Sequence, residues 1–306
     1  LDVVVRPPAE NLLETLPILR EVIVYDKYGA GRGITGFNRL VRRLRAKNYS
    51  LALLPHRSLR SALLALGAGI PQRIGFDRGG GKWLHRQRIP YPCQLHEIQR
   101  NLELLRPFNL PIPFSTPTVP ATAEDIQIVS VKMGKYAEKR CVALAPGSVW
   151  FTKRWLEQYY LELAQRLAGE GLSVIFIGGS ADKDLSQRLH KDTGGNGLDL
   201  SGELTLRQTV ELLRRCEALV TNDSAPTHLG IAARTRVLTI FGSTTPDFGF
   251  APLQPQGRSL GVELDCRPCT DHGRRRCPQR HFRCMKELAP DVVFREIIQM
   301  VNQIPL

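Results

Sequence analysis

Short apolar runs alternate with helical patterns along most of this chain, and this alternation constrains the fold more than any other feature. In the second half, apolar runs at residues 141–145, 173–177, 218–221 and 237–241 are separated by segments with helical spacing. Short buried strands that alternate with helices are typical of a parallel sheet covered on both faces. The sequence therefore predicts an α/β protein.

The first half shows the same alternation. Its strand candidates are residues 2–5, 22–25, 51–54 and 73–75, and its helix candidates are residues 11–20, 37–47, 58–66 and 95–105. A proline-rich stretch at 107–120 cannot continue a helix and indicates a connection between domains. At 306 residues the chain is long enough for two domains. We predict two Rossmann-like domains, at residues 1–120 and 121–289, followed by a helical pattern within 290–306.

The charge balance indicates anionic partners. Lys and Arg outnumber Asp and Glu by 42 to 29, which gives a net charge of +13. The basic residues are not interleaved with aromatic residues as in RNA-binding modules, so nucleic acid is not the expected partner. With no apolar run of membrane-spanning length and no leader pattern, we expect a cytoplasmic protein.

The segment Asn222-Asp223-Ser224-Ala225-Pro226-Thr227-His228 lies between an apolar strand and a helical run. Asp223 or Ser224 is a suitable N-cap, and Pro226 fits the first turn. The free amides of Ser224, Ala225 and Thr227 would then form an anion site. His228 shares a helix face with Ser224. The alternative is an ordinary capped turn with a surface histidine.

Two further strand ends of the second domain carry suitable groups. Ser148 lies in one turn and is followed by Lys153, and Asp182 follows the glycines at 178 and 179. Ligands of open parallel sheets bind beyond the carboxyl ends of the strands. Amides and a cation for phosphate, with a carboxylate for ribose hydroxyls, suit a nucleoside diphosphate.

Several motifs together resemble glycosyltransferase family 9, the ADP-heptose:lipopolysaccharide heptosyltransferases. They are Ala145-Pro146-Gly147-Ser148 with Lys153-Arg154-Trp155, Leu200-Ser201-Gly202, the 222–228 segment, and Phe241-Gly242-Ser243-Thr244-Thr245-Pro246. The run from Cys266-Arg267-Pro268-Cys269 to Cys284-Met285 is similar to the heptosyltransferase II branch. The resemblance extends to Arg57-Ser58-Leu59-Arg60 and Arg73-Ile74-Gly75-Phe76.

The resemblance implies a GT-B fold, with two Rossmann-like domains that face each other across a cleft. It implies that the second domain binds ADP-heptose and the first binds a lipid acceptor, phosphorylated lipid A bearing Kdo, at the cytoplasmic face of the inner membrane. The implied reaction is metal-independent and inverting and needs no cofactor. The last helix, within 290–306, is expected to pack back on the first domain.

Residue roles follow from the matching positions. Lys153 would stabilise the leaving diphosphate, and the other donor-site candidates are Ser148, Asp182, Asp223, Ser224, Ala225 and His228. Arg57, Arg60 and Arg73 match positions near the acceptor. For Arg57 and Arg60 the alternative is a solvated helix start.

In this family a strand and a loop with the general-base Asp precede the position of Leu1, so we expect a first βα unit and the base to lie outside these residues. Two alternatives remain open on this evidence. One is a GT-B enzyme that uses another nucleotide sugar, as a transferase for another glycan or a UDP-sugar epimerase. The other is a catalytically impaired fragment that binds anionic ligands.

Four of the seven cysteines lie close together in the sequence: Cys266, Cys269, Cys277 and Cys284, with His272 and His281 nearby. These residue types and the first spacing suit a structural zinc ion. The later spacings match no common zinc module, and the implied chemistry needs no metal. Pairs of cysteines on a surface hairpin are the alternative.

Overall fold

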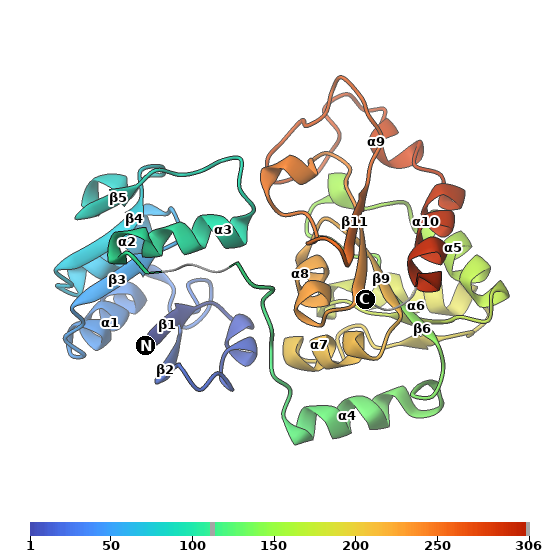
Figure 1. Cartoon of the computed structure of the whole chain (residues 1–306), viewed down its shortest axis with the longest axis horizontal. Coiled ribbons are helices and arrows are strands. Elements are labelled where there is room, and N and C mark those ends of the chain that lie inside the picture. The colour runs from blue at the N-terminus through green and yellow to red at the C-terminus, as the bar shows by residue number, and fades with distance from the viewer. Residues whose placement is uncertain (111–113, 304–306) are drawn as a thin grey trace. The chain divides into compact units, whose positions relative to one another are not determined.

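The computed structural model describes residues 1–110 and 114–303, and the chain divides into two compact units (Figure 1). The first unit comprises Leu1–Glu10 and Pro17–Ser115, and the second comprises Asn11–Leu16 and Thr116–Leu306. The division falls close to the boundary predicted at residue 120. It also assigns one short early segment to the second unit.

The first unit holds two small parallel sheets. β1 (Asp2–Val5) pairs with β2 (Glu21–Val24), while β3 (Leu51–Leu54), β4 (Gln72–Phe76) and β5 (Gln87–Ile89) form the other sheet. The helices are α1 (Gly33–Arg45), α2 (Leu59–Gly67) and α3 (Glu97–Leu102). Leu40 and Leu44 of α1 pack with Leu64 of α2 and Ile23 of β2 to form the core.

The prediction of a helix at residues 11–20 is wrong. Ala9–Leu12 forms one turn of 3₁₀ helix, and the chain then continues in turns. Asn11 is engaged by Arg207, whose amide donates to Asn11 Oδ1 at 2.9 Å and whose Nη1 donates to the Asn11 carbonyl at 3.0 Å. That carbonyl is therefore not used in a helix, and Pro17 has no N–H to continue one.

The second unit is built on one six-stranded parallel sheet. Its strands are β6 (Cys141–Ala145), β7 (Ser173–Phe176), β8 (Leu198–Asp199), β9 (Ala218–Asn222), β10 (Arg236–Ile240) and β11 (Gly257–Leu260). They lie in the order β11-β10-β9-β6-β7-β8. The order therefore reverses between β6 and β9, and such a reversal is where doubly wound sheets bind ligands.

Helices cover both faces of this sheet. They are α4 (Ala123–Met133), α5 (Glu157–Gly169), α6 (Lys183–Asp192), α7 (Leu206–Arg214), α8 (Ala225–Ala232), α9 (Arg283–Lys286) and α10 (Pro290–Asn302). Alternate strand residues point to opposite faces, so Val142 and Leu144 pack in one core and Ala143 in the other. No helix in the described ranges is both long and apolar enough to span a bilayer.

Helix α10 packs within the second unit, and the expectation that the last helix packs back on the first domain stays a prediction. Its buried residues Val293, Ile297 and Met300 belong to a core of the second unit, and α10 contacts α5, β9 and β10. The apolar stripe at helical spacing is therefore covered within its own unit. Residues 304–306 of the predicted helix lie outside the described residues.

A buried ion pair joins α4 to α7 in the second unit. Arg207 Nε donates to Asp125 Oδ2, and the side chains of Arg207 and Asp125 are 12% and 3% exposed. Burial would raise the pKa of Asp125, but the bonds from Arg207 and from the Thr122 backbone lower it to about 2. Because this folded-state value lies below the usual 3.8, the carboxylate stabilises the fold above about pH 4 and loses that contribution as the pH falls.

We therefore expect Asp125→Asn to lower the free energy of unfolding by about 2 kcal/mol at pH 7, from a pKa shift of roughly two units. Denaturant unfolding measured between pH 7 and pH 3 tests this. The difference between the wild type and the variant should shrink by about half at pH 3, because the wild-type carboxylate is then losing its linkage contribution. A difference that does not change with pH would contradict this assignment.

Candidate functional site

The amide side chain of Asn222 joins the two strand ends at the point where the sheet order reverses. Asn222 ends β9 and is fully buried. Its Oδ1 accepts from the Trp155 amide at 2.9 Å, and its Nδ2 donates to the Pro146 carbonyl at 2.8 Å. The loop that follows β6 is thereby fixed to the end of β9. Asn222 belongs to the 222–228 motif, but its role in joining the strand ends was not predicted from the sequence.

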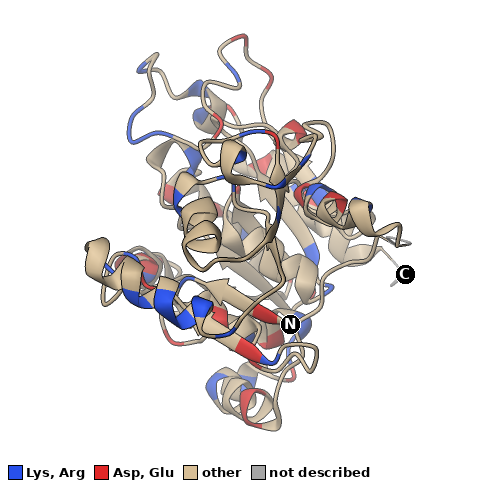
Figure 2. Ribbon diagram, turned by 90° about the vertical axis from the view of Figure 1, so that its left-hand side faces the viewer, with Lys and Arg blue, Asp and Glu red and all other residues tan. Residues whose placement is uncertain are grey.

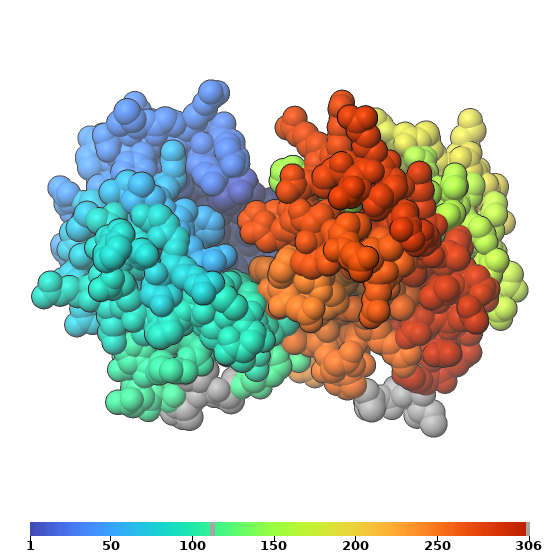
Figure 3. Space-filling model, turned by 90° about the horizontal axis from the view of Figure 1, so that it is seen from above, coloured from blue at the N-terminus to red at the C-terminus, as the bar shows by residue number. Residues whose placement is uncertain are grey.

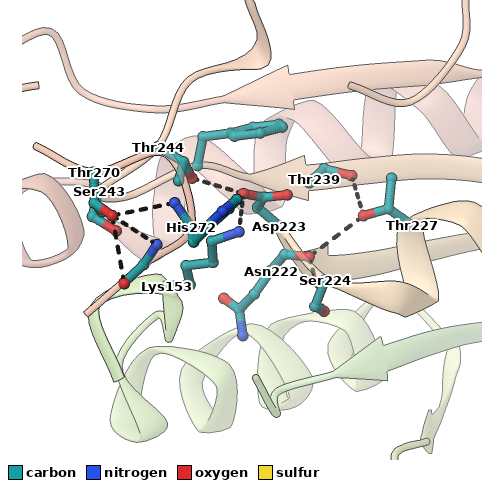
Figure 4. Close-up of polar contacts among 12 residues, drawn as sticks. Lys153, Asn222, Asp223, Ser224, Thr227, Thr239, Ser243, Thr244, Thr270 and His272 are labelled. Carbon is teal, nitrogen blue, oxygen red and sulfur yellow. Dashed lines mark hydrogen bonds and ion pairs between the residues drawn. The ribbon is translucent and has the colours of Figure 1, made fainter. Parts of the chain in front are cut away.

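Lys153 and Asp223 form an ion pair at this point (Figure 4). Lys153 ends a 3₁₀ turn, Phe151–Lys153, and its Nζ lies 2.6 Å from Asp223 Oδ2. Only 14% of the lysine side chain and 11% of the aspartate side chain are exposed. The hydroxyl of Thr244 donates to the same carboxylate oxygen at 2.7 Å. The ammonium group is therefore held in place beside the start of α8.

The N-terminus of α8 has no side-chain cap, contrary to the expectation from the sequence. Ser224 occupies the N-cap position, but its hydroxyl donates back to the Asn222 carbonyl at 3.2 Å, and Asp223 binds Lys153. The Thr227 amide donates to the Ser224 carbonyl, so it is not a third free donor. Within residues 1–110 and 114–303, the amides of Ser224 and Ala225 have no acceptor. These two donors are available to an anion.

The loops after β6 and β7 meet through Asp182. Its Oδ2 accepts from the Gly179 amide at 3.0 Å. A Cβ placed on Gly147 would lie 2.1 Å from Asp182 Oδ1, so a larger residue there would displace this carboxylate. Ser148 is buried in the adjoining turn, and its carbonyl accepts from Arg154 Nε at 2.7 Å. Asp182 thus orders its own loop and keeps one oxygen, Oδ1, on the side of the β6 loop.

His228 lies one turn along α8 from Ser224 and is exposed. Its ring makes an edge contact with Phe250, with the ring centroids 6.3 Å apart. The structure thus groups Lys153, Asp223, Ser224 and Ala225 most tightly, with His228 at the next turn of the same helix.

The segment after β11, residues 261–289, spreads over one face of the second unit and braces the site (Figure 3). The Thr152 hydroxyl accepts from the Arg274 amide at 2.8 Å and contacts Ser243 Oγ at 3.0 Å. Arg267 donates to the Thr244 carbonyl at 2.9 Å, and burial lowers the pKa of this guanidinium. Sequence reasoning missed these bracing residues, although the motif at 241–246 marked the segment that they hold.

The four cysteines of this segment are free thiols. Cys266 Sγ lies 3.9 Å from His281 Nε2, and burial raises the pKa of Cys284 to about 11. In the part of the chain that the structure describes, no three Cys, His, Asp or Glu side chains are placed to hold a metal ion. The zinc hypothesis for Cys266, Cys269, Cys277 and Cys284 is therefore not supported by the geometry.

The three arginines proposed for the acceptor divide into two kinds in the first unit. Arg57 stacks over the Tyr91 ring at 4.3 Å, and Arg60 Nη1 donates to the Tyr25 hydroxyl at 2.7 Å; both are exposed. Arg73 instead donates to the backbone carbonyls of Leu84, Ile70 and Pro71. The Arg73 guanidinium thus braces β4 and is not grouped with the other two.

Further basic residues lie beside Arg57 at the carboxyl ends of the strands. His56 follows β3. Its pKa is lowered mainly by partial burial, and then by the positive charges of Lys27, Arg57 and Arg6. Arg6 follows β1 and Lys27 follows β2. Sequence reasoning did not identify Arg6, Lys27 or His56, although a polar residue just after each predicted strand was the available signal. Arg6, Lys27, His56 and Arg57 are called the strand-end cluster below.

Known proteins resemble this chain over most of its length. The family model described as glycosyltransferase family 9 (heptosyltransferase) matches residues 37–278. The chain is 27% identical over 275 residues to lipopolysaccharide heptosyltransferase 2 of Salmonella typhimurium, covering 85% of this chain and 78% of that protein.

Two solved structures show the same fold. The E. coli ADP-heptose LPS heptosyltransferase II structure matches with a TM-score of 0.79 at 24% identity, covering 98% of this chain and 88% of that one. A family 9 glycosyl transferase from Veillonella parvula matches with a TM-score of 0.85 at 18% identity, again covering 98% and 88%. The predicted α/β fold of the GT-B class, with its Rossmann-like units, is thereby confirmed.

Replacing Asn222 with Ala should lower the free energy of unfolding by about 2–4 kcal/mol, because the Trp155 amide and the Pro146 carbonyl would both lose a buried partner. Denaturant unfolding measures this. As a matched control, Thr239→Val removes one buried hydroxyl contact, that with Thr227 Oγ1 at 3.0 Å, and should cost about 1 kcal/mol. Equal losses in the two variants would contradict the joining role of Asn222.

Proposed function

Since the chain belongs to glycosyltransferase family 9, we propose that it transfers a heptose from ADP-heptose to the inner core of lipopolysaccharide. One observation carries the proposal. A held ammonium group, Lys153, stands beside an uncapped helix N-terminus at the point where a Rossmann-like sheet reverses its order. The curated relative named above supports the identity of the sugar and the acceptor.

The donor site suits a diphosphate for electrostatic reasons. The amides of Ser224 and Ala225 and the positive end of the α8 dipole favour bound negative charge. Lys153 supplies a full positive charge, but Asp223 neutralises part of it in the unliganded site. The Thr244 hydroxyl donates to the Asp223 carboxylate, so it helps to hold Asp223 in place when Lys153 moves towards the phosphate. Ser148, Asp182 and His228 would make further contacts with the sugar nucleotide around Lys153 and the α8 N-terminus.

The proposed reaction is a single displacement at the anomeric carbon, with inversion. The acceptor hydroxyl oxygen forms the new bond, and its proton passes to a carboxylate general base. The bond from the anomeric carbon to the β-phosphate oxygen breaks, and its electron pair leaves with ADP. Negative charge therefore grows on the diphosphate in the transition state, next to Lys153 and the α8 amides. Donors of this kind, placed before the reaction, typically contribute 10²–10³-fold to the rate.

We place acceptor recognition on the first unit. Arg57 and Arg60 are exposed, and Arg6 and Lys27 add positive charge around Arg57 in the strand-end cluster. Phosphate groups on lipid A and the carboxylates of Kdo are the anionic groups that such a cluster would bind. An acceptor of this kind lies in a membrane, so the enzyme would work at the cytoplasmic face of the inner membrane.

Lys153→Ala should raise the Kd for ADP about 10–100-fold, because a charge-assisted hydrogen bond is worth about 1.5–3 kcal/mol. Calorimetric titration measures the change. Lys183→Ala is the matched control, since Lys183 lies in the same unit and pairs with Glu203; its ADP affinity should be unchanged. Unchanged affinity in Lys153→Ala would count against the site, and tighter binding of UDP than of ADP would favour another nucleotide sugar.

Arg57→Ala combined with Arg60→Ala should raise KM for the lipid acceptor about 10–100-fold and leave ADP affinity unchanged, from the loss of two contacts to anionic groups. Steady-state kinetics with acceptor and donor varied separately test this. Arg106→Ala removes an exposed arginine of the same unit that pairs with Glu103, and it should change neither constant. Arg73→Ala should lower stability rather than acceptor affinity; a specific acceptor defect there would contradict its bracing role.

A further inference from the structure

Helix α2 in the first unit is apolar on both faces. Ala62, Leu64 and Ala65 are buried in the core beneath it. On the opposite face Leu59, Leu63 and Leu66 are 49%, 39% and 42% exposed. Their spacing of i, i+4 and i+7 places them in one stripe along the helix. A surface helix usually buries its apolar residues on one face, so a second, exposed stripe of three leucines marks α2 as a candidate contact surface.

An exposed tryptophan lies in a turn that contacts the same helix. Trp83 is 74% exposed and belongs to the short turn Lys82–Leu84, which contacts α2. Gly81 lies so close to the helix that an added Cβ would meet Ala62 Cβ at 2.6 Å. Lys82 Nζ and Arg88 Cζ stand 4.9 and 5.3 Å from the Trp83 ring centre. Tryptophan flanked by basic residues is typical of side chains at a lipid–water interface.

The sequence around α2 carries a large excess of positive charge. Residues 27–96 contain 14 Lys and Arg but a single carboxylate, Asp77, and so account for a net charge of +13, the value for the whole chain. Four of these cations, Arg39, Arg42, Arg43 and Arg45, lie on α1 (Figure 2). Close to an anionic membrane each basic residue is worth about 1 kcal/mol of attraction. The charge therefore selects an anionic surface as the partner of the apolar stripe.

We propose that Leu59, Leu63, Leu66 and Trp83, here called the α2 surface, insert into the headgroup region of an anionic phospholipid bilayer. The flanking cations Lys82, Arg86 and Arg88 bind the lipid phosphates. An apolar face combined with basic residues is the composition of elements that lie in the interface without crossing the membrane. The inference extends the proposed function, on which it rests only for the location of the acceptor.

Docking in this way serves the proposed acceptor site. Helix α2 begins at Leu59, directly after the Ser58 N-cap, and Arg57 of the strand-end cluster precedes that cap. The first turn of the helix also carries Arg60. An α2 surface seated in the headgroups therefore brings the N-terminal end of the helix, and with it the cations proposed for the acceptor, to the level of the lipid phosphates.

Co-sedimentation with vesicles tests the inference. The full chain should bind vesicles of phosphatidylglycerol and phosphatidylethanolamine at least tenfold more tightly than vesicles of phosphatidylcholine alone, and high salt should weaken the binding. Leu63→Asp combined with Leu66→Asp should reduce vesicle binding at least tenfold and leave ADP affinity unchanged. Val131→Asp is the matched control, since Val131 is 74% exposed on α4 of the second unit, and it should bind like the wild type.

Fluorescence gives a second readout. Anionic vesicles should shift the emission of the chain to shorter wavelength, and Trp83→Phe should abolish the shift, because the other tryptophans, Trp150 and Trp155, lie in the second unit. Equal binding to neutral and anionic vesicles, or full binding by the double variant, would overturn the proposal. The proposal would also be overturned if the wild type were a dimer, the double variant were a monomer, and both bound vesicles equally. The stripe would then be covered by a second copy of the chain. ADP affinity reports separately on the donor site.

Discussion

The hydrogen bonds of one buried amide, that of Asn222, set the register of the whole donor site. The same side chain binds the amide of Trp155, two residues after Lys153, and directly precedes Asp223 in the chain. Both members of the Lys153–Asp223 ion pair are therefore positioned by one group. An ion pair alone would not achieve this, because long charged side chains gain little from pairing unless their backbones are fixed. The amide fixes those backbones at the junction of β6 and β9.

The N-terminus of α8 lacks the stabilisation of a side-chain cap at the place where we propose that the diphosphate binds. A side-chain cap at a helix N-terminus is worth about 1 kcal/mol, yet at α8 the Ser224 hydroxyl turns back to the strand and Asp223 turns to the lysine. The residues around the site are, by contrast, heavily hydrogen-bonded through Thr152, Ser243 and Arg267. Two open amides inside a rigid frame are preorganised for an anion, and the surrounding bonds offset the cost of leaving them open.

The sequence was sufficient to predict the α/β class and the Rossmann-like fold, and it identified the strand ends whose loops meet around Lys153 and Asp223. These features depend on periodicity and on the position of strand ends. The sequence did not predict contacts between distant residues. The prediction of a helix at 11–20 was wrong because Arg207 donates to the Asn11 carbonyl, and the packing of α10 on α5 was not predicted. Arg73 and Asp182 carry the charges expected at a ligand site, but backbone groups nearby use part or all of their bonding capacity. Residue type and spacing alone give no sign of such local partners.

Each unit has its own hydrophobic cores: the described core clusters of the first unit, around Ile23 and Phe76, contain no residue of the second. The proposed acceptor cations project from loops and helix starts above the first set of cores, and the diphosphate site is framed by the second. If the proposed sites are correct, substitutions that change which acceptor is bound would accumulate without disturbing nucleotide binding. Selection would then vary one substrate at a time, and enzymes that diverge in the glycans they extend would inherit the proposed nucleotide-sugar site unchanged.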